Sequence, residues 1–361
     1  MCWRPFARSP PIRSEVWRWR ALVGAALVAG WALGPAAQTA GPSSPGRVET
    51  LRAVSAVPVE VVGEFREPLG FERLASGLEL VFDRRGHAVY GIAPGRGSSR
   101  KLVAIGGEDG RVIEPTAFDA DPSGTFVVAD APNGRERVQL FTSAGVRAGG
   151  FTLPGRATPR VTLGSLSLSG IGTLHYTGRS VLISQPETGG LMTEYGLAGT
   201  PVRTVGRLRA TGHEGDRELH LALNAGIPLK GSDAGYWFVF LAGTPAFSRF
   251  AADGTLLFHR VIQGRELDPV VAALPAVWPR RAFDGTDVPL VSPTIRAAAL
   301  SPAGELWISF VVPYTYVFDG LGEKLRTVQF VAAGLVAPNS LAFPSATRLL
   351  VTPGCVEFAT R

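Results

Sequence analysis

The chain has 361 residues, of which 45% are hydrophobic and 18% charged, so it can bury a sizeable core as one large repeat fold or two domains. Its 44 glycines and 28 prolines, spread among short Val, Leu and Phe runs, indicate an all-β protein rich in turns. The net charge is +6, and residues 1–40 contribute five arginines and one acid to it. The rest of the chain has 31 basic and 29 acidic residues, which is nearly balanced. It contains no basic stripe with interleaved aromatics, which argues against a nucleic-acid partner.

Residues 1–37 have the composition of a signal peptide. Five arginines precede an apolar run over residues 21–33, and small residues follow at 34–37. About 13 apolar residues make a poor membrane span. We therefore expect a cleaved signal and a periplasmic or secreted protein of the bacterial envelope. An uncleaved N-terminal anchor is the alternative, and it would be the only contact with a membrane. Residues 38–57 are rich in Ala, Gly, Pro and Ser, which predicts a flexible linker to a domain over 58–361.

A turn that recurs between apolar runs is the most informative feature of the chain. An aromatic residue is followed four positions later by glycine at Phe141–Gly145, Tyr195–Gly199, Phe250–Gly254 and Phe318–Gly322. We expect each to be a hairpin whose glycine has positive φ, because glycine adopts that conformation without a Cβ clash. Recurrence at about 54 residues, with one longer step, indicates a repeat architecture.

A second turn marks six units and predicts the number of blades. It precedes a β-rich run in residues 82–92, 120–130, 176–185, 232–241, 300–310 and 343–352. Five units continue into a third and a fourth strand, which predicts a six-bladed β-propeller of four-stranded blades. The sixth unit lacks one strand. We expect residues 59–65 (VEVVGEF) to supply it by pairing with residues 356–358, which closes the ring and covers an open edge.

Residues 121–145, DPSGTFVVADAPNGRERVQLFTSAG, resemble an NHL-type repeat. A turn, a "VAD" strand, an Asn-Arg segment and a "VQ-x-F" strand follow in that order, and residues 300–325 are a looser copy. The resemblance is to bacterial exported six-bladed propellers of the NHL and TolB-like type. That group includes binding scaffolds, lactonases, lyases and quinone-dependent sugar dehydrogenases, so the resemblance implies a fold and leaves the function open.

The links between blades differ in length, and the longest of them predict where a ligand binds. Residues 154–162, 207–218 and 263–293 are excursions, whereas the glycine hairpins stay short. Loops that lengthen on one side of a rigid scaffold usually carry binding. In the last excursion we expect a short helix over 266–274. Trp278 and Arg280, with Arg281, form either a lid for an anionic or sugar-like ligand or a packed loop with solvated arginines.

Arg296 is an unusual charge in an inner strand made otherwise of Ile, Ala and Leu. A charge there is costly unless it is paired or hydrated. It is predicted either to line the channel and hold an acidic ligand or to form a structural ion pair, with Glu114 as one possible partner. Both residues are therefore candidates for ligand binding.

Asn339 lies in APNSLAF, which resembles the "PNGLAF" segment of gluconolactonase-like propellers, where the Asn is a metal ligand. The Glu, Asn and Asp that the family pattern also needs are incomplete here, so we expect no metal and an Asx turn at Asn339. The five histidines lack ligand spacing, and His220 is retained as a ligand-binding candidate. Cys355, the one cysteine beyond the N-terminal segment, is expected to be a small buried residue.

The function predicted from the sequence is a binding scaffold for an unknown small ligand or an envelope protein, with the site at the channel mouth and no cofactor. The alternative is a propeller enzyme, namely a lactonase, lyase or sugar oxidoreductase. A convergent set of acids, amides or histidines at the channel mouth would distinguish the two, and the sequence shows only an incomplete one.

Overall fold

The structure, a computed structural model, describes residues 38–39, 48–95, 97–155, 159–163, 166–283 and 286–360. The predicted signal peptide lies outside these residues. Within the described ranges, no helix is both long enough and apolar enough to cross a membrane.

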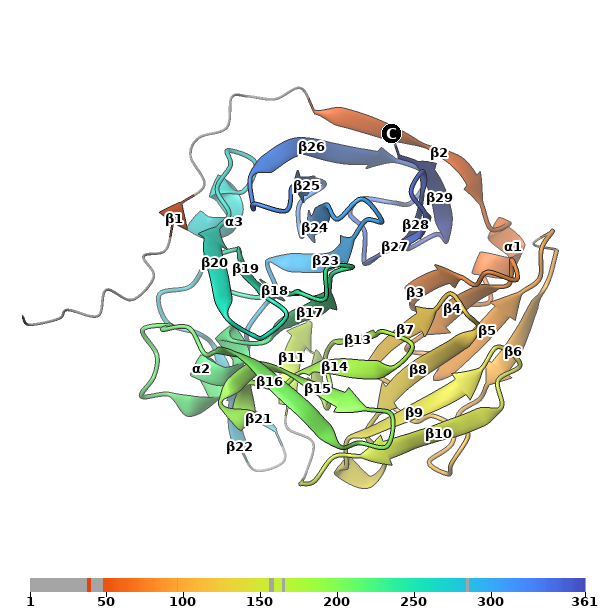
Figure 1. The fold of residues 1–361 in the computed structure, drawn as a ribbon, viewed down its shortest axis with the longest axis horizontal. Coiled ribbons are helices and arrows are strands. Elements are labelled where there is room, and N and C mark those ends of the chain that lie inside the picture. The colour runs from red at the N-terminus through yellow and green to blue at the C-terminus, as the bar shows by residue number, and fades with distance from the viewer. Residues whose placement is uncertain are drawn as a thin grey trace, which may run out of the picture. The chain divides into compact units, whose positions relative to one another are not determined.

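The chain forms an all-β fold in which sheets stand in a propeller-like arrangement (Figure 1). Three sheets have four antiparallel strands each: β3–β6 (Pro68–Arg73, Glu79–Asp83, Ala88–Ile92, Ser99–Val103), β7–β10 (Ala117–Asp121, Thr125–Asp130, Arg137–Thr142, Arg147–Thr152) and β13–β16 (Leu174–Tyr176, Ser180–Ser184, Gly190–Gly196, Pro201–Arg207). A fourth contains β17–β20 (Gly226–Lys230, Tyr236–Phe240, Ala246–Phe250, Leu256–Val261), with β1 (Gln38–Thr39) parallel to its outer edge.

The largest sheet has eight strands in the order β23-β24-β25-β26-β2-β29-β28-β27. Its strands are β23–β26 (Ile295–Leu300, Leu306–Phe310, Thr315–Phe318, Lys324–Val331), β2 (Glu49–Ala56) and β27–β29 (Ser340–Ser345, Arg348–Thr352, Val356–Ala359). This sheet therefore contains both of the last two predicted units, and β2 joins them. Because these units share one continuous sheet, strand pairing alone does not separate six blades.

The second strands of the sheets pass through the cores between neighbouring sheets. Every residue of β4, β14, β18 and β24 is buried, as expected for apolar runs covered on both faces. The glycines of the four predicted hairpins have φ of 82°, 82°, 91° and 81° at Gly145, Gly199, Gly254 and Gly322. The predicted positive φ is confirmed at all four turns.

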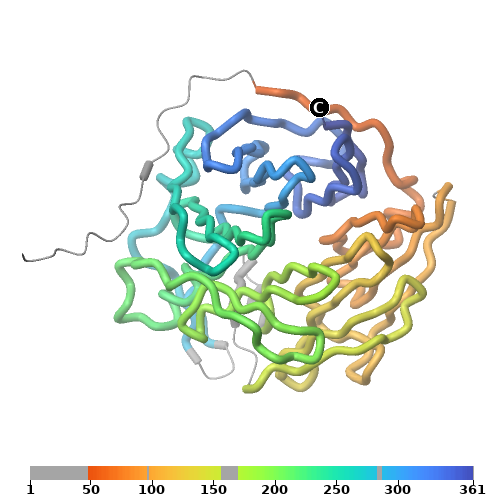
Figure 2. The backbone as a smooth tube through the Cα atoms, in the orientation of Figure 1, coloured from red at the N-terminus to blue at the C-terminus, as the bar shows by residue number. Residues whose placement is uncertain are grey.

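An N-terminal strand does complete the last unit, but its predicted position was wrong. Strand β2 (Glu49–Ala56) pairs antiparallel with β29, with Ala53 opposite Phe358 and Ala56 opposite Val356, and also parallel with β26. It lies within the segment 38–57 that we predicted as a linker. Residues 59–65, predicted as the closing strand, instead contain helix α1 (Val59–Val62). Figure 2 shows the β2 segment running beside the C-terminal part of the chain.

Helix α1 fills the space where the first and last units meet. Val61 and Phe65 pack in one cluster with Phe71 of β3 and Leu350 of β28. Cys355 is fully buried in the same cluster, as the sequence predicted. The apolar pattern of residues 59–65 therefore reflects burial at this junction and not a strand.

In the NHL-like motif, Asp130 joins Arg137 of the next strand to the loop that contains Ile113. Asn133 has a left-handed φ of 54° in the turn Pro132–Gly134. Asp130 is completely buried and accepts hydrogen bonds from Arg137 Nε (2.9 Å), Arg137 Nη2 (2.7 Å) and the Ile113 amide (3.1 Å). The motif thus has a structural role.

Two of the predicted excursions pack against each other. The first excursion, residues 207–218, leads into helix α2 (Arg217–Leu223). The second, residues 263–293, contains helix α3 (Asp268–Ala272), which is shorter than the predicted helix. It also contains a two-stranded ribbon of β21 (Arg280–Phe283) and β22 (Thr286–Pro289). Leu219, Leu223 and Trp278 form one buried cluster with Ala242 and Val291. We call this unit the cap. The remaining short ribbon pairs β11 (Pro159–Leu163) with β12 (Leu166–Ser169).

Candidate functional site

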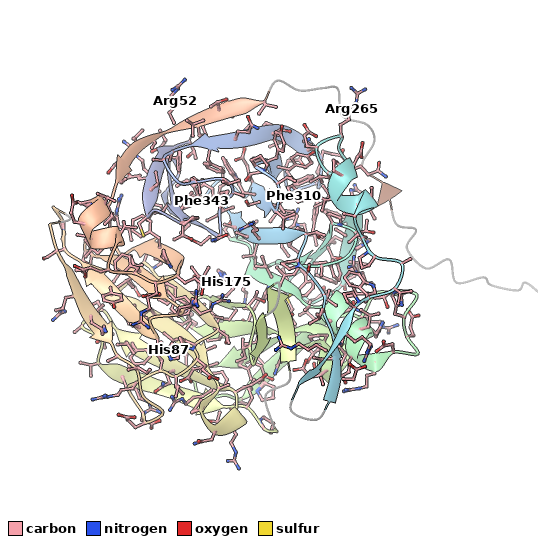
Figure 3. All side chains as sticks on the ribbon, turned by 180° about the vertical axis from the view of Figure 1, so that it is seen from behind. Arg52, His87, His175, Arg265, Phe310 and Phe343 are labelled. Atoms are coloured by element: carbon pink, nitrogen blue, oxygen red, sulfur yellow. The ribbon has the colours of Figure 1, made fainter. Side chains whose placement is uncertain are left out.

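The inner strands surround a cavity of about 720 Å³. It is lined by residues of β3, β7, β13, β17, β23 and β27 and, from the cap, by Ala222 and Val291. Most of the lining is apolar. Its polar lining residues include Arg296 and Asn339, the group Glu72, Asp119 and His175, and the ion-paired residues Glu67, Arg84 and Lys230. Figure 3 labels two lining residues, His175 of β13 and Phe343 of β27.

Arg296 and Asn339 meet where two inner strands begin. Arg296 is the second residue of β23, and Asn339 directly precedes β27. The Arg296 guanidinium donates a hydrogen bond to Asn339 Oδ1 at 2.7 Å. Arg296 is exposed, and among the described residues no carboxylate pairs with it. The guanidinium therefore keeps donors that can reach a ligand in the cavity.

Glu114 and His220, two other predicted ligand-binding residues, lie outside the cavity lining. Glu114 is exposed with φ of 49°, and its amide donates to His87 Nδ1 at 3.2 Å. Arg296 pairs with Asn339 and not with Glu114, so the predicted Arg296–Glu114 ion pair does not form. His220 of α2 lies with its Nδ1 2.8 Å from Thr211 Oγ1, within the cap.

Trp278 and Arg280 belong to the packing of the cap. Trp278 is buried in the cap's apolar cluster and is not among the residues that line the cavity. Arg280 pairs with Asp216 at 2.6 Å and with Asp287 at 2.7 Å, and these bonds raise the pKa of its guanidinium. Of the two interpretations of this excursion, the geometry matches the packed loop, although the arginine is paired and not merely solvated.

Three ionisable residues that the sequence analysis did not select meet on the cavity wall. Glu72, Asp119 and His175 come from the neighbouring inner strands β3, β7 and β13. His175 Nδ1 lies 2.9 Å from Asp119 Oδ2. The same oxygen accepts the Tyr176 amide at 2.6 Å, and Oδ1 accepts the Ala120 amide at 3.0 Å. Backbone donors and a histidine therefore fix the Asp119 carboxylate.

Glu72 has a strongly perturbed carboxyl group. Burial raises the pKa of Glu72 well above its ordinary value, and the negative charge of Asp119 raises this pKa further. Among the described residues its carboxyl group forms no hydrogen bond or ion pair, although its side chain borders the cavity. An unpaired acid of this kind remains protonated at pH values where an ordinary glutamate is charged.

The remaining charges of the lining are already paired. Arg84 forms two hydrogen bonds with Glu67, at 2.5 and 3.0 Å. Lys230 pairs with Glu194 at 2.6 Å, and Glu194 also accepts from Tyr236 at 2.7 Å. These ion pairs stabilise the cavity wall. Arg296 and the group Glu72, Asp119 and His175 are then the lining residues that could contact a ligand.

Within the described part of the chain, no group of three or more His, Cys, Asp or Glu side chains is placed to hold a metal ion. Asn339, the residue that resembles a metal ligand of gluconolactonase-like propellers, has its Oδ1 engaged by Arg296. Asn339 is therefore a hydrogen-bond partner of the Arg296 guanidinium.

No family model matches the sequence, and no curated protein matches it. Solved structures with partial similarity include virginiamycin B lyase from Staphylococcus aureus, with 11% identity, coverage of 84% of this chain and 81% of that chain, and a TM-score of 0.48. A gluconolactonase from Xanthomonas campestris has 16% identity, coverage of 89% and 97%, and a TM-score of 0.48. Hydrazine synthase of Kuenenia stuttgartiensis has 11% identity, coverage of 82% and 96%, and a TM-score of 0.48. These values are too low to support an argument about activity or substrate.

Proposed function

We propose that this chain is an exported six-bladed β-propeller of the NHL-repeat type, closed by its N-terminal strand. The count is supported by the strand order: four successive strands run from the centre outwards in β3–β6, β7–β10, β13–β16, β17–β20 and β23–β26. The sixth set consists of β27, β28 and β29 with β2 as its outer strand. The motif over residues 121–145 supports the NHL assignment.

The function that we propose is the binding of a small acidic ligand at the channel mouth, with the propeller as the scaffold. The observation that carries this proposal is Arg296, an exposed guanidinium on the cavity lining. Its hydrogen-bond partner among the described residues is an uncharged amide, that of Asn339. A guanidinium presents a planar set of donors that matches a carboxylate or phosphate by paired hydrogen bonds. Asn339 would hold this group in place.

Binding of acidic compounds tests the proposal. Thermal shift followed by calorimetry would use acetate, citrate, gluconate and sugar phosphates. Arg296→Met should weaken binding by about tenfold or more, and Arg296→Lys should retain only part of the affinity, since Lys lacks the paired donors. Arg100→Met, at an exposed position of the outer strand β6, is the matched control. Equal affinities in all variants, or no binding of any of these acids by the wild type, would refute this function.

Export is the second part of the proposal, and the composition of residues 1–37 supports it. The mature N-terminus should lie between residues 34 and 40, where small residues follow the apolar run. Intact-mass measurement on protein recovered from the periplasm or medium tests this. A full-length mass in the membrane fraction would favour the anchor. A docked envelope protein in place of a small ligand would appear as a co-purifying partner whose binding survives Arg296→Met.

The alternative function is a propeller enzyme: a lactonase, lyase or sugar oxidoreductase. The observation that favours it is the contact between Asp119 and His175 on the cavity wall, at 2.9 Å. Such a pair is the usual way to orient a histidine for proton transfer.

A further inference from the structure

The ionisable residues of the wall are brought together by the packing of neighbouring inner strands. Gly70 of β3 faces Phe118 of β7 so closely that an added Cβ would lie 2.7 Å from the Phe118 ring. Glu72 follows two residues after this contact, and Asp119 directly follows Phe118. Asp119 then reaches the third strand through His175. The missing side chain at Gly70 thus lets β3 approach β7 and sets Glu72 near the Asp119 charge.

We propose that Asp119, His175 and Glu72 form a proton-transfer site on the channel wall that acts on a small oxo acid. His175 is the base, Asp119 orients it, and Glu72 is the acid. The assignment of a carboxylate-bearing substrate rests on the proposed binding of acids by Arg296. The proton-transfer site itself rests only on the three residues and the cavity that they line.

The contact with Asp119 determines which nitrogen of His175 is available. A carboxylate only accepts hydrogen bonds, so the proton of a neutral His175 ring sits on Nδ1, which donates to Asp119 Oδ2 at 2.9 Å. Nε2 then carries the lone pair. Among the described residues no group hydrogen-bonds Nε2, and the ring lines the cavity. The imidazole is therefore oriented as a base, and Asp119 stabilises the cation that forms when Nε2 takes up a proton.

Glu72 is placed to give a proton back. Its carboxyl group has no partner in the described part of the chain and borders the same cavity. Burial and the Asp119 charge raise the pKa of Glu72 and so favour its protonated form. An acid and a base that line the same cavity can act on the two ends of one carbonyl group.

The reaction that fits this pair is enolisation. His175 Nε2 removes a proton from the carbon next to the carbonyl, and that C–H electron pair forms the new C=C bond. The C=O π pair moves to oxygen, which takes the Glu72 proton, so the carbonyl becomes an enol. The site ends as an imidazolium and a carboxylate, with no net redox change. Reversal of both transfers restores the substrate and exchanges its proton with water.

Two probes separate the two parts of this inference. Pyruvate in D2O reports exchange of its methyl protons by NMR and carries a carboxylate. A nitrobenzisoxazole is neutral and loses one C–H proton to a base while its N–O bond breaks, which releases a coloured phenolate. Wild type should accelerate both reactions above buffer. His175→Gln should reduce each protein-dependent rate by about 100-fold, within the usual range for loss of a general base.

The other variants assign the roles. Asp119→Asn should lower both rates, and Asp119→Glu, which keeps the carboxylate, should restore part of each rate, a recovery that a merely structural role would not produce. Glu72→Gln should slow pyruvate exchange and leave the nitrobenzisoxazole reaction nearly unchanged, since that reaction needs a base only. Arg296→Met should slow pyruvate exchange alone, and Arg100→Met should change neither. Melting curves of His175→Gln would confirm that it folds.

The outcomes distinguish failure of the site from failure of the proposed function. If wild type accelerates neither reaction, or if His175→Gln retains both rates, the proton-transfer site is wrong. If the neutral probe depends on His175 but pyruvate does not exchange, the site stands and the oxo-acid substrate is wrong. If pyruvate exchanges equally fast in Arg296→Met, the proposed anion binding by Arg296 is wrong while the proton-transfer site is supported.

Discussion

Arg73 of β3 donates hydrogen bonds to both carboxylate oxygens of Glu357 in β29, at 3.2 and 2.8 Å, across a separation of 284 residues. The same guanidinium binds Glu79 of β4 at 2.6 Å. The hydrogen bonds to Glu357 and then to Glu79 raise the pKa of Arg73, although partial burial opposes this. This contact ties the first sheet of the chain to its last strand.

We predict that Arg73→Met lowers the free energy of unfolding by about 1–3 kcal/mol, because two nearly buried carboxylates lose their shared cation. Urea unfolding of the variant and of Arg100→Met provides the comparison. If the urea midpoint of Arg73→Met moves as little as that of Arg100→Met, the contact between Arg73 and Glu357 is not needed to join the first sheet to the last strand.

Strand β2 makes the second closure, and its removal gives a separate prediction. A chain that begins at residue 48 keeps β2, and a chain that begins at residue 57 leaves the edges of β26 and β29 unpaired. We expect the shorter chain to melt several degrees lower, at about 2–4 °C for each kcal/mol lost. Coincident melting curves for the two chains would contradict this form of closure.

The sequence predicted that an N-terminal strand completes the ring but selected the wrong segment, for a physical reason. The run at residues 59–65 is apolar because Val61 and Phe65 pack at the junction of the first and last units. In contrast, Leu51 is the one buried residue of β2. Backbone hydrogen bonds to strands on both sides hold β2 in place, and such pairing leaves little trace in side-chain hydrophobicity. The glycine hairpins were predictable because a positive φ at one turn position favours glycine there, and that glycine can be read directly from the sequence.

The candidate site was predictable only in part. Arg296 was selected because a charge within an apolar inner strand is unusual, and Asn339 because of its motif. The same reasoning applies to Glu72 in LGFER and Asp119 in FDAD, which also lie in inner strands. Their meeting with His175 depends on how far β3, β7 and β13 are offset from one another, which no single strand encodes. For Trp278 and Arg280, the sequence could not distinguish cap packing from ligand contact.

Glu72 gives a pH-dependent prediction whose sign follows from its raised pKa. The protonated form is favoured in the folded protein, so its contribution is complete below the ordinary glutamate pKa of about 4.3 and is lost as pH rises through the folded value. Glu72→Gln stays neutral and avoids this loss. The stability of Glu72→Gln relative to wild type should therefore increase from pH 5 to pH 8, measured by urea unfolding.

Two controls accompany this measurement. Glu60→Gln, at an exposed position in α1, is the matched control for the loss of one glutamate charge. Asp119→Asn removes the neighbouring charge and should reduce the pH dependence caused by Glu72. An identical difference between Glu72→Gln and wild type at both pH values would mean that this carboxyl group titrates normally in the folded protein.

The pair of Asp130 and Arg137 tests whether the NHL-like motif serves stability or ligand binding. Asp130 is completely buried, and Arg137 also donates to the backbone carbonyls of Gly107 and Arg111, at 2.9 and 3.1 Å. Breaking a buried pair by removing one partner costs about 3–5 kcal/mol, because the other charge remains in a poorly solvated place. Asp130→Ala and Arg137→Met should each cost about that much in urea unfolding.

The double variant sharpens this prediction. With both charges gone, neither is left buried alone, so Asp130→Ala with Arg137→Met should cost less than the sum of the two single changes by about 1–3 kcal/mol. Neither residue lines the cavity. Folded protein of each single variant should therefore bind acids and transfer protons at 25 °C as the wild type does. Additive costs would mean that the two side chains are not coupled, and loss of binding in folded protein would give the motif a role in the site after all.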